Sequence, residues 1–397
     1  MPALVDWLED IEQLAEELPR LHANLFHQRS EHDFRMDVMQ LKTDLPSLDD
    51  SMIVVRLMQL IASIGDAHTT LIPPIQHYLP LAFYLFEEGL FVIAAQPEHG
   101  DCLGSRVVAI EGVPIEQVME QVKATLSHEN DAFVAAHLPL YLAAADLLYG
   151  LAISEAIDAV EITFKQRTGE TKSKLLTTVH HHDLNNDWLQ LEVHDGTDSV
   201  SGKTHLPLYR QGHEFSFWFM VLEPDSIYIQ YNACRPLPDY RMPAAFDDLL
   251  QPIDSQPDGP LKLVFDLRNN RGGDSTLIEP LITAIAKRTR ASPERLRVYV
   301  IIGRDTFSSA LLNAYSLKNQ THAVIVGEAS GGKPNSYGEV QYLTLRRTRL
   351  RVRYSTKYYE LVEDDALPSM IPDWPCTVTF TDYLSGHDPC LSAILGR

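Results

Sequence analysis

The sequence predicts an α/β protein built from several domains. Three short apolar runs rich in Val and Ile occupy Leu261–Leu267, Val298–Ile302 and Ala323–Val326, and segments of helical length separate them. This pattern is typical of buried parallel strands joined by helices. The length of 397 residues also favours a division into domains, because one hydrophobic core rarely serves so long a chain.

Composition restricts the classes of partner. Hydrophobic residues make up 45% and charged residues 22% of the chain, which is typical of a globular protein. Lysine and arginine number 33 against 54 acidic residues, so the net charge of −21 disfavours nucleic acids and anionic membrane surfaces as partners. The four cysteines are widely spaced and include no Cys-x-x-Cys pair, which argues against a zinc knuckle and a disulfide framework. We therefore expect reduced thiols and no cofactor.

The N-terminal segment lacks the features of a targeting signal. It begins M-P-A-L-V-D-W-L-E-D-I-E, which is acidic and amphipathic and has neither the basic nor the apolar region of a signal peptide. The chain also lacks an apolar run of the ~18 residues that a transmembrane helix needs. We expect a cytoplasmic location, or secretion if a leader has been removed from this chain.

Residues 1–75 are predicted to form an N-terminal helical region. Apolar residues recur at helical spacing in residues 3–27 and again in 51–64. The region ends in I-G-D-A-H-T-T-L, where His68 is a candidate catalytic or substrate-contacting imidazole because histidine titrates near neutral pH. The alternative, which we prefer, is a buried histidine that ties the helical region to its neighbour through hydrogen bonds.

Residues 76–182 are predicted to form a β-domain with a helical insertion at about 128–158. Its short β-type segments are bounded by Gly, Pro or Asp. The segment S-R-V-V-A-I-E-G-V-P-I, with a turn at Gly112, resembles the strand–turn–helix of a PDZ-like domain. Such domains bind extended peptide termini by adding a strand to a sheet edge. Polar residues 183–213 are predicted to link this domain to a third one at 214–397.

His180, His181 and His182 form the one cluster that could attract a metal ion. Side chains of adjacent residues alternate between the two faces of an extended chain, so three neighbours should not share one ion. No second pattern of metal ligands lies nearby in the sequence. We therefore expect a solvent-exposed loop at this position and no metal site.

The turns after the three apolar runs carry the residues with catalytic chemistry. Ligands of open α/β sheets bind at the carboxyl ends of the strands, so these turns can converge on one crevice. Ser308 lies in T-F-S-S-A, where a strand-to-helix turn would expose its hydroxyl and aim the amide of Ser309 at a developing negative charge. Lys333 could act as a base if burial disfavoured its ammonium form, or could be a surface lysine. Gly272 and Gly273 could offer a second amide, because no side chain blocks the approach.

These segments resemble the tail-specific, or C-terminal-processing, serine peptidases, a family that includes tricorn core protease and the repeats of interphotoreceptor retinoid-binding protein. The resemblance implies a crotonase- or ClpP-like α/β catalytic domain at 214–397 and a Ser–Lys dyad. By this similarity Ser308 is the nucleophile, Lys333 is the general base, and the amides of Ser309 and of Gly272 or Gly273 form the oxyanion hole. The resemblance rests on the segments L-V-F-D-L-R-N-N-R-G-G (263–273), T-F-S-S-A (306–310), V-G-E-A-S-G-G-K-P-N (326–335), Y-S-T-K-Y (354–358), I-P-D (371–373) and G-H-D-P-C-L (386–391), and more weakly on I-G-D-A-H-T upstream.

The chain departs from the family pattern at one position. Many Ser–Lys members place a glutamine four residues after the lysine to orient it, whereas this chain has Tyr337. A phenol can donate to or accept from an amine, so Tyr337 is a candidate for that role. Tricorn-type members instead use a histidine-assisted serine with a glutamate, and His68 and Glu339 are available for such a scheme. We hold the dyad as the expectation because Lys333 falls at the family's spacing from Ser308.

The resemblance predicts a serine endopeptidase that acts on unstructured polypeptides or C-terminal tails. One rival is a non-catalytic peptide- or small-ligand-binding protein on the same scaffold, since fold does not fix function. The presence of both dyad residues argues against it. The other rival is an esterase- or thioesterase-like acyl hydrolase, because crotonase-type folds act on acyl groups, and the PDZ-like segment argues for a peptide instead. A homo-oligomer is left open.

Overall fold

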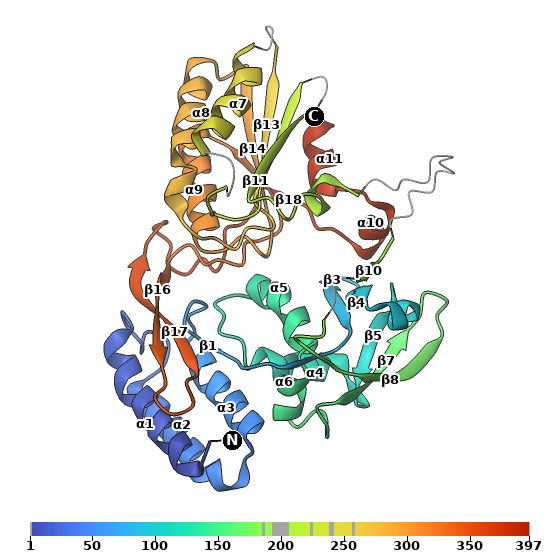
Figure 1. Ribbon diagram of the computed structural model, residues 1–397. Helices are drawn as coiled ribbons and strands as arrows, with labels where there is room; N and C mark the ends of the chain where they lie inside the picture. The colour runs from blue at the N-terminus through green and yellow to red at the C-terminus, as the bar shows by residue number, and fades with distance from the viewer. Residues whose placement is uncertain are drawn as a thin grey trace. The chain divides into compact units, whose positions relative to one another are not determined.

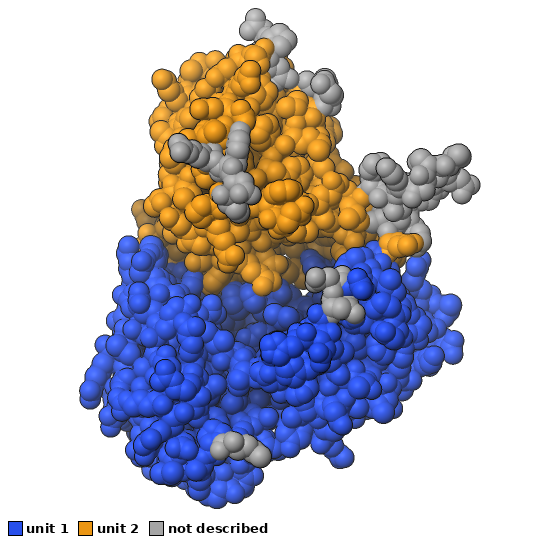
Figure 2. All heavy atoms as spheres, in the orientation of Figure 1, with its two compact units in different colours: residues 1–191, 336–359 blue, residues 192–335, 360–397 orange. Residues whose placement is uncertain are grey.

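The computed structural model describes residues 2–184, 187–192, 206–222, 225–237, 242–255 and 259–396. The chain divides into two compact units (Figures 1 and 2). Unit 1 comprises residues 1–191 and 336–359, and unit 2 comprises residues 192–335 and 360–397. The predicted linker at 183–213 lies partly outside the described residues, at 185–186 and 193–205.

Unit 2 contains a six-stranded sheet with the order β11-β12-β13-β14-β15-β18. The first pair is antiparallel and the other four pairs are parallel, which confirms the buried parallel strands predicted from the three apolar runs. Every residue of β13 is buried, as expected for a central strand covered on both faces. The strands are β11 (Phe217–Leu222), β12 (Ser226–Tyr231), β13 (Leu261–Asp266), β14 (Leu296–Ile302), β15 (Val324–Gly327) and β18 (Trp374–Pro375).

Helices cover both faces of this sheet (Figure 1). The apolar side chains of α7 (Met242–Ser255), α8 (Glu279–Ala291) and α9 (Ser309–Thr321) share one hydrophobic core with alternate residues of the strands. The opposite face packs against α11 (Pro389–Leu395), which follows α10 (Phe380–Ser385). The carboxyl ends of β13, β14 and β15 therefore lie side by side at one edge of a doubly covered sheet.

The first part of unit 1 is helical, as predicted for residues 1–75. It consists of α1 (Leu4–Leu21), α2 (Glu31–Asp44) and α3 (Asp50–Ala62). Helix α2 was not predicted, because only three of its residues are buried and its apolar periodicity is weak. Its start is set by Ser30, whose hydroxyl accepts the Asp33 amide at 3.1 Å.

A three-stranded antiparallel sheet completes this helical part, with the order β1-β17-β16. Strand β1 (Thr70–Ile72) pairs with β17 (Arg351–Tyr359), which pairs with β16 (Ser336–Thr344). The predicted third domain at 214–397 included these two late strands. The structure groups residues 336–359 with unit 1, because β17 bonds to β1 and contributes side chains to the unit 1 core.

The predicted PDZ-like region forms the rest of unit 1. Its main sheet runs β10-β4-β5-β7-β8, with β3 paired to β4 and β6 to β5. The predicted insertion at 128–158 contains α5 (Asp131–Leu142) and α6 (Ala145–Gly150). The remaining elements are β2 (His77–Tyr78), β3 (Leu81–Phe86), β4 (Gly89–Ala95), β5 (Arg106–Ile110), β6 (Val113–Pro114), α4 (Ile115–Lys123), β7 (Ala159–Lys165), β8 (Thr171–Thr177), β9 (Val179–His180) and β10 (Leu189–Gln190).

The predicted fold class, an α/β chain with PDZ-like and N-terminal helical regions, is confirmed by these elements. Short 3₁₀ turns occur at Leu45–Ser47, Pro97–Cys102, Leu208–Arg210 and Ser275–Leu277. Within the described ranges, none of the helices combines the length and the hydropathy needed to cross a bilayer.

Candidate active site

Ser308 occupies a strained turn between β14 and α9. It is the residue just before the helix and has φ 54° and ψ −129°, a conformation that side-chain-bearing residues rarely adopt. Such a conformation costs roughly 1–3 kcal/mol and persists only where the surroundings fix it. The Thr306 hydroxyl donates to the Leu267 carbonyl at 2.8 Å, and the Phe307 amide donates to the Asn270 carbonyl at 3.1 Å. These two hydrogen bonds attach the turn that carries Ser308 to the segment that follows β13.

The glycine pair after β13 lies directly against this serine. Gly272 and Gly273 have φ values of +98° and +136°, which favour glycine. A Cβ atom at Gly272 would lie 2.8 Å from the Ser308 Cβ and 2.9 Å from the Ser309 nitrogen. Only a residue without a side chain permits this backbone to approach so closely.

Asn270 organises the glycine turn from inside the protein. Its side chain is fully buried, donates to the Tyr231 carbonyl at 2.8 Å and accepts the Gly272 amide at 2.9 Å. A second anchor is Cys234, whose backbone accepts from the Asp274 amide at 2.8 Å and donates to the Gly272 carbonyl at 3.0 Å. Burial raises the pKa of the Cys234 thiol to about 11, which favours the protonated thiol near neutral pH.

Two backbone amides near Ser308 remain available to an anion. The Gly272 amide, one of the predicted oxyanion donors, is engaged by Asn270. In the part of the chain that the structure describes, neither the Gly273 amide nor the Ser309 amide donates a hydrogen bond. The Ser309 hydroxyl donates to the Gly273 carbonyl at 2.6 Å, which keeps these two residues together at the start of α9. The positive end of the helix dipole adds to the attraction for a negative charge.

The turn after β15 brings Lys333 to the same edge of the sheet. The Gly332 amide donates to the Thr306 carbonyl at 3.1 Å, two residues before Ser308. The Ser330 hydroxyl, fully buried, donates to the Gly332 carbonyl at 2.7 Å and fixes the turn. Lys333 itself is half-buried, and no carboxylate among the described residues forms an ion pair with it.

A buried cluster of charged side chains lies next to the turn that follows β13. The Arg268 side chain is 9% exposed and donates to Asp388 through both terminal nitrogens, at 3.2 and 2.9 Å. Its Nε donates to Asp266 Oδ1 at 3.0 Å. The cluster connects the end of β13 to the residue that caps α11. Sequence reasoning assigned no role to Arg268 or Asn270, although both fall in the segment 263–273 that carries the resemblance.

His68 lies in unit 1, and its side chain is 11% exposed. Its backbone amide donates to Asp66 Oδ1 at 2.9 Å, and His22 Nε2 lies 2.9 Å from Asp66 Oδ2. Burial lowers the pKa of the His68 imidazole, so the neutral form predominates near pH 7. Burial alone would raise the pKa of Asp66, but the hydrogen bonds from His22, Ser355 and Thr69 hold it well below its ordinary value. These contacts link the end of α1 to the turn before β1.

Tyr337 and Glu339, the other two candidates from the sequence, lie on β16 of the same unit. The Tyr337 ring packs among His22, His27 and Tyr358, with centroid distances of 5.2, 4.6 and 4.8 Å. Glu339 is exposed and accepts the Tyr359 hydroxyl at 2.5 Å. Burial and this hydrogen bond raise the pKa of Tyr359 to about 12.

The predicted site residues thus fall into two sets. Unit 2 brings Ser308, Ser309, Gly272 and Gly273 into contact and adds the turn of Lys333, whereas His68, Tyr337 and Glu339 belong to unit 1. Within the described residues, the one group of three metal-ligating side chains is His180, His181 and His182 in unit 1.

Comparison with known proteins gives structural matches only. No family model and no curated protein matches the sequence. The solved structures that match include mature CPAF complexed with lactacystin, at 12% identity and a TM-score of 0.67, with 96% of each chain covered. Mature CPAF alone gives 12% identity and a TM-score of 0.66 over 99% of this chain and 96% of that one. A candidate peptidase from Parabacteroides merdae ATCC 43184 gives 12% and 0.50 over 98% and 96%.

The chain has the fold of the tail-specific peptidases. The resemblance predicted from the sequence segments is thereby confirmed at the level of the fold. Because the matches cover nearly the whole chain, they include the helical and PDZ-like regions as well as the sheet that carries Ser308.

Proposed function

We propose that this protein is a serine endopeptidase that cleaves unstructured polypeptides or C-terminal tails. The observation that carries the proposal is the strained Ser308, held beside the two unengaged amides of Gly273 and Ser309. A strained serine at a strand-to-helix turn, with adjacent amides that can bind an oxyanion, is the arrangement that acyl transfer requires. The shared fold agrees with this chemistry.

In the proposed mechanism Ser308 Oγ attacks the carbonyl carbon of the scissile peptide bond while Lys333 accepts its proton. The negative charge then moves to the carbonyl oxygen, where the amides of Gly273 and Ser309 would stabilise it. Collapse of this intermediate breaks the C–N bond, and the protonated base donates its proton to the leaving amine. Water, deprotonated by the same base, then hydrolyses the acyl-enzyme.

The first test is covalent labelling with a fluorophosphonate probe followed by mass spectrometry. We expect the probe to label the peptide that contains Ser308 and expect Ser308→Ala to remove the label. Ser316→Ala is the matched control, because Ser316 lies on the same helix but bonds to Glu279 at 3.0 Å. Absence of labelling in folded protein between about pH 7 and 10 would instead favour a binding protein without catalytic activity.

A second test concerns the substrate. Ser308→Ala should reduce hydrolysis of a disordered polypeptide by several orders of magnitude, by analogy with roughly 10⁴–10⁶-fold losses in triad knockouts. The rival acyl hydrolase predicts fast turnover of small esters or thioesters and no cleavage of any polypeptide. Such a result would contradict the peptidase proposal while leaving Ser308 as the nucleophile.

The identity of the base is tested with paired variants. Lys333→Arg keeps the positive charge but cannot release a proton near neutral pH, so it should inactivate the enzyme as fully as Lys333→Met does. The competing candidate is His68, whose neutral imidazole could also accept a proton. Retained activity in both Lys333 variants, together with inactivity of His68→Gln, would assign the base to His68.

A further inference from the structure

The geometry points to a zinc-binding site formed by His180, His181 and His182. We propose that these three imidazoles bind one Zn²⁺ ion, with a fourth position left for water. The ligand nitrogens of the three side chains all lie within 4.8 Å of one another. This inference does not depend on the proposed peptidase activity.

The backbone explains why three consecutive side chains converge. The sequence predicted that they would alternate between faces, which holds only for extended chain. Strand β9 ends at His180, and the next three residues form a turn in which the Asp183 amide donates to the His180 carbonyl at 2.8 Å. The turn takes His181 and His182 out of the extended path, so the alternation of side chains between two faces does not apply to them. The expectation that the three side chains alternate between faces therefore does not hold at this turn, whereas His182 is exposed, as expected for a loop.

The three rings are already close together. The His181 and His182 centroids are 3.7 Å apart, and the centroid of His180 lies 4.6 and 5.1 Å from them. In a tetrahedral site with Zn–N bonds of about 2.0–2.1 Å, the ligand nitrogens are roughly 3.4 Å apart. The three side chains are half-buried or exposed, and we expect rotation about their side-chain bonds to supply the remaining adjustment.

Two nitrogens of the cluster are suited to accept a cation. His181 Nδ1 is buried, and no hydrogen bond of normal geometry reaches it from the described residues. A buried polar atom in this state is costly unless a partner binds it. His180 Nδ1 receives only a weak contact of 3.4 Å from the His182 amide, so its lone pair is available to a metal ion that displaces this contact.

The surrounding structure holds the turn in place. Strand β9 pairs with β2, with His180 opposite His77, and the His181 amide donates to the Gln76 carbonyl at 2.7 Å. The His77 ring packs edge-on against His180 at 5.4 Å, and its Nδ1 lies 3.3 Å from Asp146 Oδ1. Asp146 also accepts the amides of Gln76 and His77, at 3.0 and 2.7 Å.

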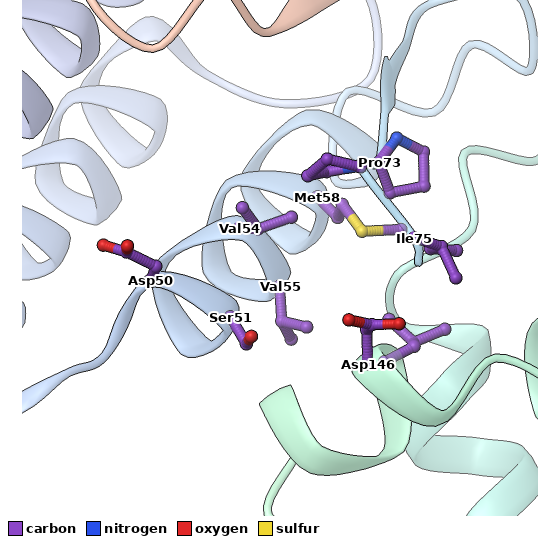
Figure 3. Close-up of a pocket in the computed structure, with 10 residues that line it drawn as sticks. Asp50, Ser51, Val54, Val55, Met58, Pro73, Ile75 and Asp146 are labelled. Carbon is purple, nitrogen blue, oxygen red and sulfur yellow. The ribbon is translucent and has the colours of Figure 1, made fainter. Parts of the chain in front are cut away.

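Asp146 connects this frame to a pocket of unit 1. Figure 3 shows Asp146 among the residues that line the pocket, together with side chains of α3 such as Val55. Pro73 and Ile75, which precede β2, line the same pocket. The strand opposite the histidine turn, β2, also contacts α6 of the same unit. A turn that these hydrogen bonds already fix loses less conformational entropy when it binds a metal ion.

Ligand chemistry favours zinc over the alkaline-earth ions. Neutral imidazole suits Zn²⁺, Cu²⁺ and Ni²⁺, whereas Ca²⁺ and Mg²⁺ prefer oxygen ligands. Three histidines with one open position are a recurrent zinc environment. The net charge of −21 also raises the local concentration of cations near the protein.

The test is a titration of the full-length, chelator-treated protein with Co²⁺, whose visible absorption reports coordination number and which Zn²⁺ should displace. We expect one equivalent of Co²⁺ to bind, with the absorption of a four-coordinate ion. His181→Ala and His182→Ala should each weaken binding by more than about 100-fold, since loss of an outer-shell partner alone costs roughly 10–100-fold. The matched control is His32→Ala, because His32 is an exposed histidine of the same unit, on α2, and its variant should bind like the parent protein.

Two outcomes of the titration would overturn the proposal: the absence of saturable binding, or equal binding by the parent, His181→Ala and His182→Ala proteins. A second measurement uses the unmodified protein and so does not depend on the folding of variants. Zn²⁺ should protect residues 180–182 from diethyl pyrocarbonate at least tenfold, as read by mass spectrometry, while labelling of His32 stays constant. Equal labelling of the turn with and without Zn²⁺ would also contradict the site.

Discussion

The replacement Gly273→Ala should destabilise unit 2 more than an ordinary glycine replacement does. A Cβ atom at this position would lie 2.1 Å from the Cys234 carbonyl oxygen and 2.9 Å from its carbonyl carbon. Both are backbone atoms, which cannot rotate away. Relief of the clash would have to separate the two segments and weaken the hydrogen bond of 2.8 Å from the Asp274 amide to Cys234.

The expected cost has two parts. Positive φ, here +136°, costs a residue with a Cβ roughly 1–2 kcal/mol. Overpacking of a well-packed site adds roughly 1–3 kcal/mol. The free energy of unfolding of unit 2 should therefore fall by about 2–5 kcal/mol, which for a domain of this size corresponds to a decrease in Tm of roughly 4–20 °C.

Gly169→Ala is the matched control. Gly169 also has a positive φ, +91°, but a Cβ atom there would meet nothing within 4 Å. It should cost only the conformational part, about 1–2 kcal/mol, in unit 1. The difference between the two variants isolates the clash with Cys234.

Hydrogen-exchange mass spectrometry over a urea series is the appropriate assay, because peptides from each unit report that unit's own unfolding. We expect the peptides around β13 and α9 to lose protection at lower urea in Gly273→Ala. If Gly273→Ala proved no more destabilising to unit 2 than Gly169→Ala is to unit 1, the close approach of the glycine turn to Cys234 would be refuted.

The remaining predictions concern ionised groups. Burial lowers the pKa of His68 from its ordinary value of 6.5, so below that pH the unfolded chain binds the proton more readily than unit 1 does. Unit 1 should therefore lose stability as pH falls from about 7 to 5, and His68→Gln should flatten this dependence in urea unfolding experiments; an unchanged slope would argue against the buried imidazole. In unit 2, Asp388→Ala leaves the buried Arg268 with one carboxylate fewer and should cost roughly 3–5 kcal/mol. Asp254→Ala breaks the exposed pair with Arg288 and should cost less than about 1 kcal/mol, so equal losses in the two variants would contradict the buried role of Arg268.

Much of the site in unit 2 followed from local sequence patterns. The three apolar runs predicted β13, β14 and β15, and the positions of Ser308, Gly272–Gly273 and Lys333 at the ends of these strands followed directly. This succeeded because burial on both faces leaves a continuous apolar run, and because parallel neighbours place their carboxyl ends at one edge. The resemblance to the tail-specific peptidases rests on those same turns.

Other features depended on contacts between segments far apart in the chain. Which glycine keeps a free amide was decided by the Asn270 side chain, and the membership of residues 336–359 in unit 1 was decided by the pairing of β17 with β1. The ligand nitrogens of His180, His181 and His182 come within 4.8 Å of one another at the turn that follows β9, and β9 itself depends on its pairing with the distant β2. Local propensity determines where strands and turns can form. The hydrogen-bond partners that end a strand or occupy an amide come from distant segments, so only the tertiary structure determines them.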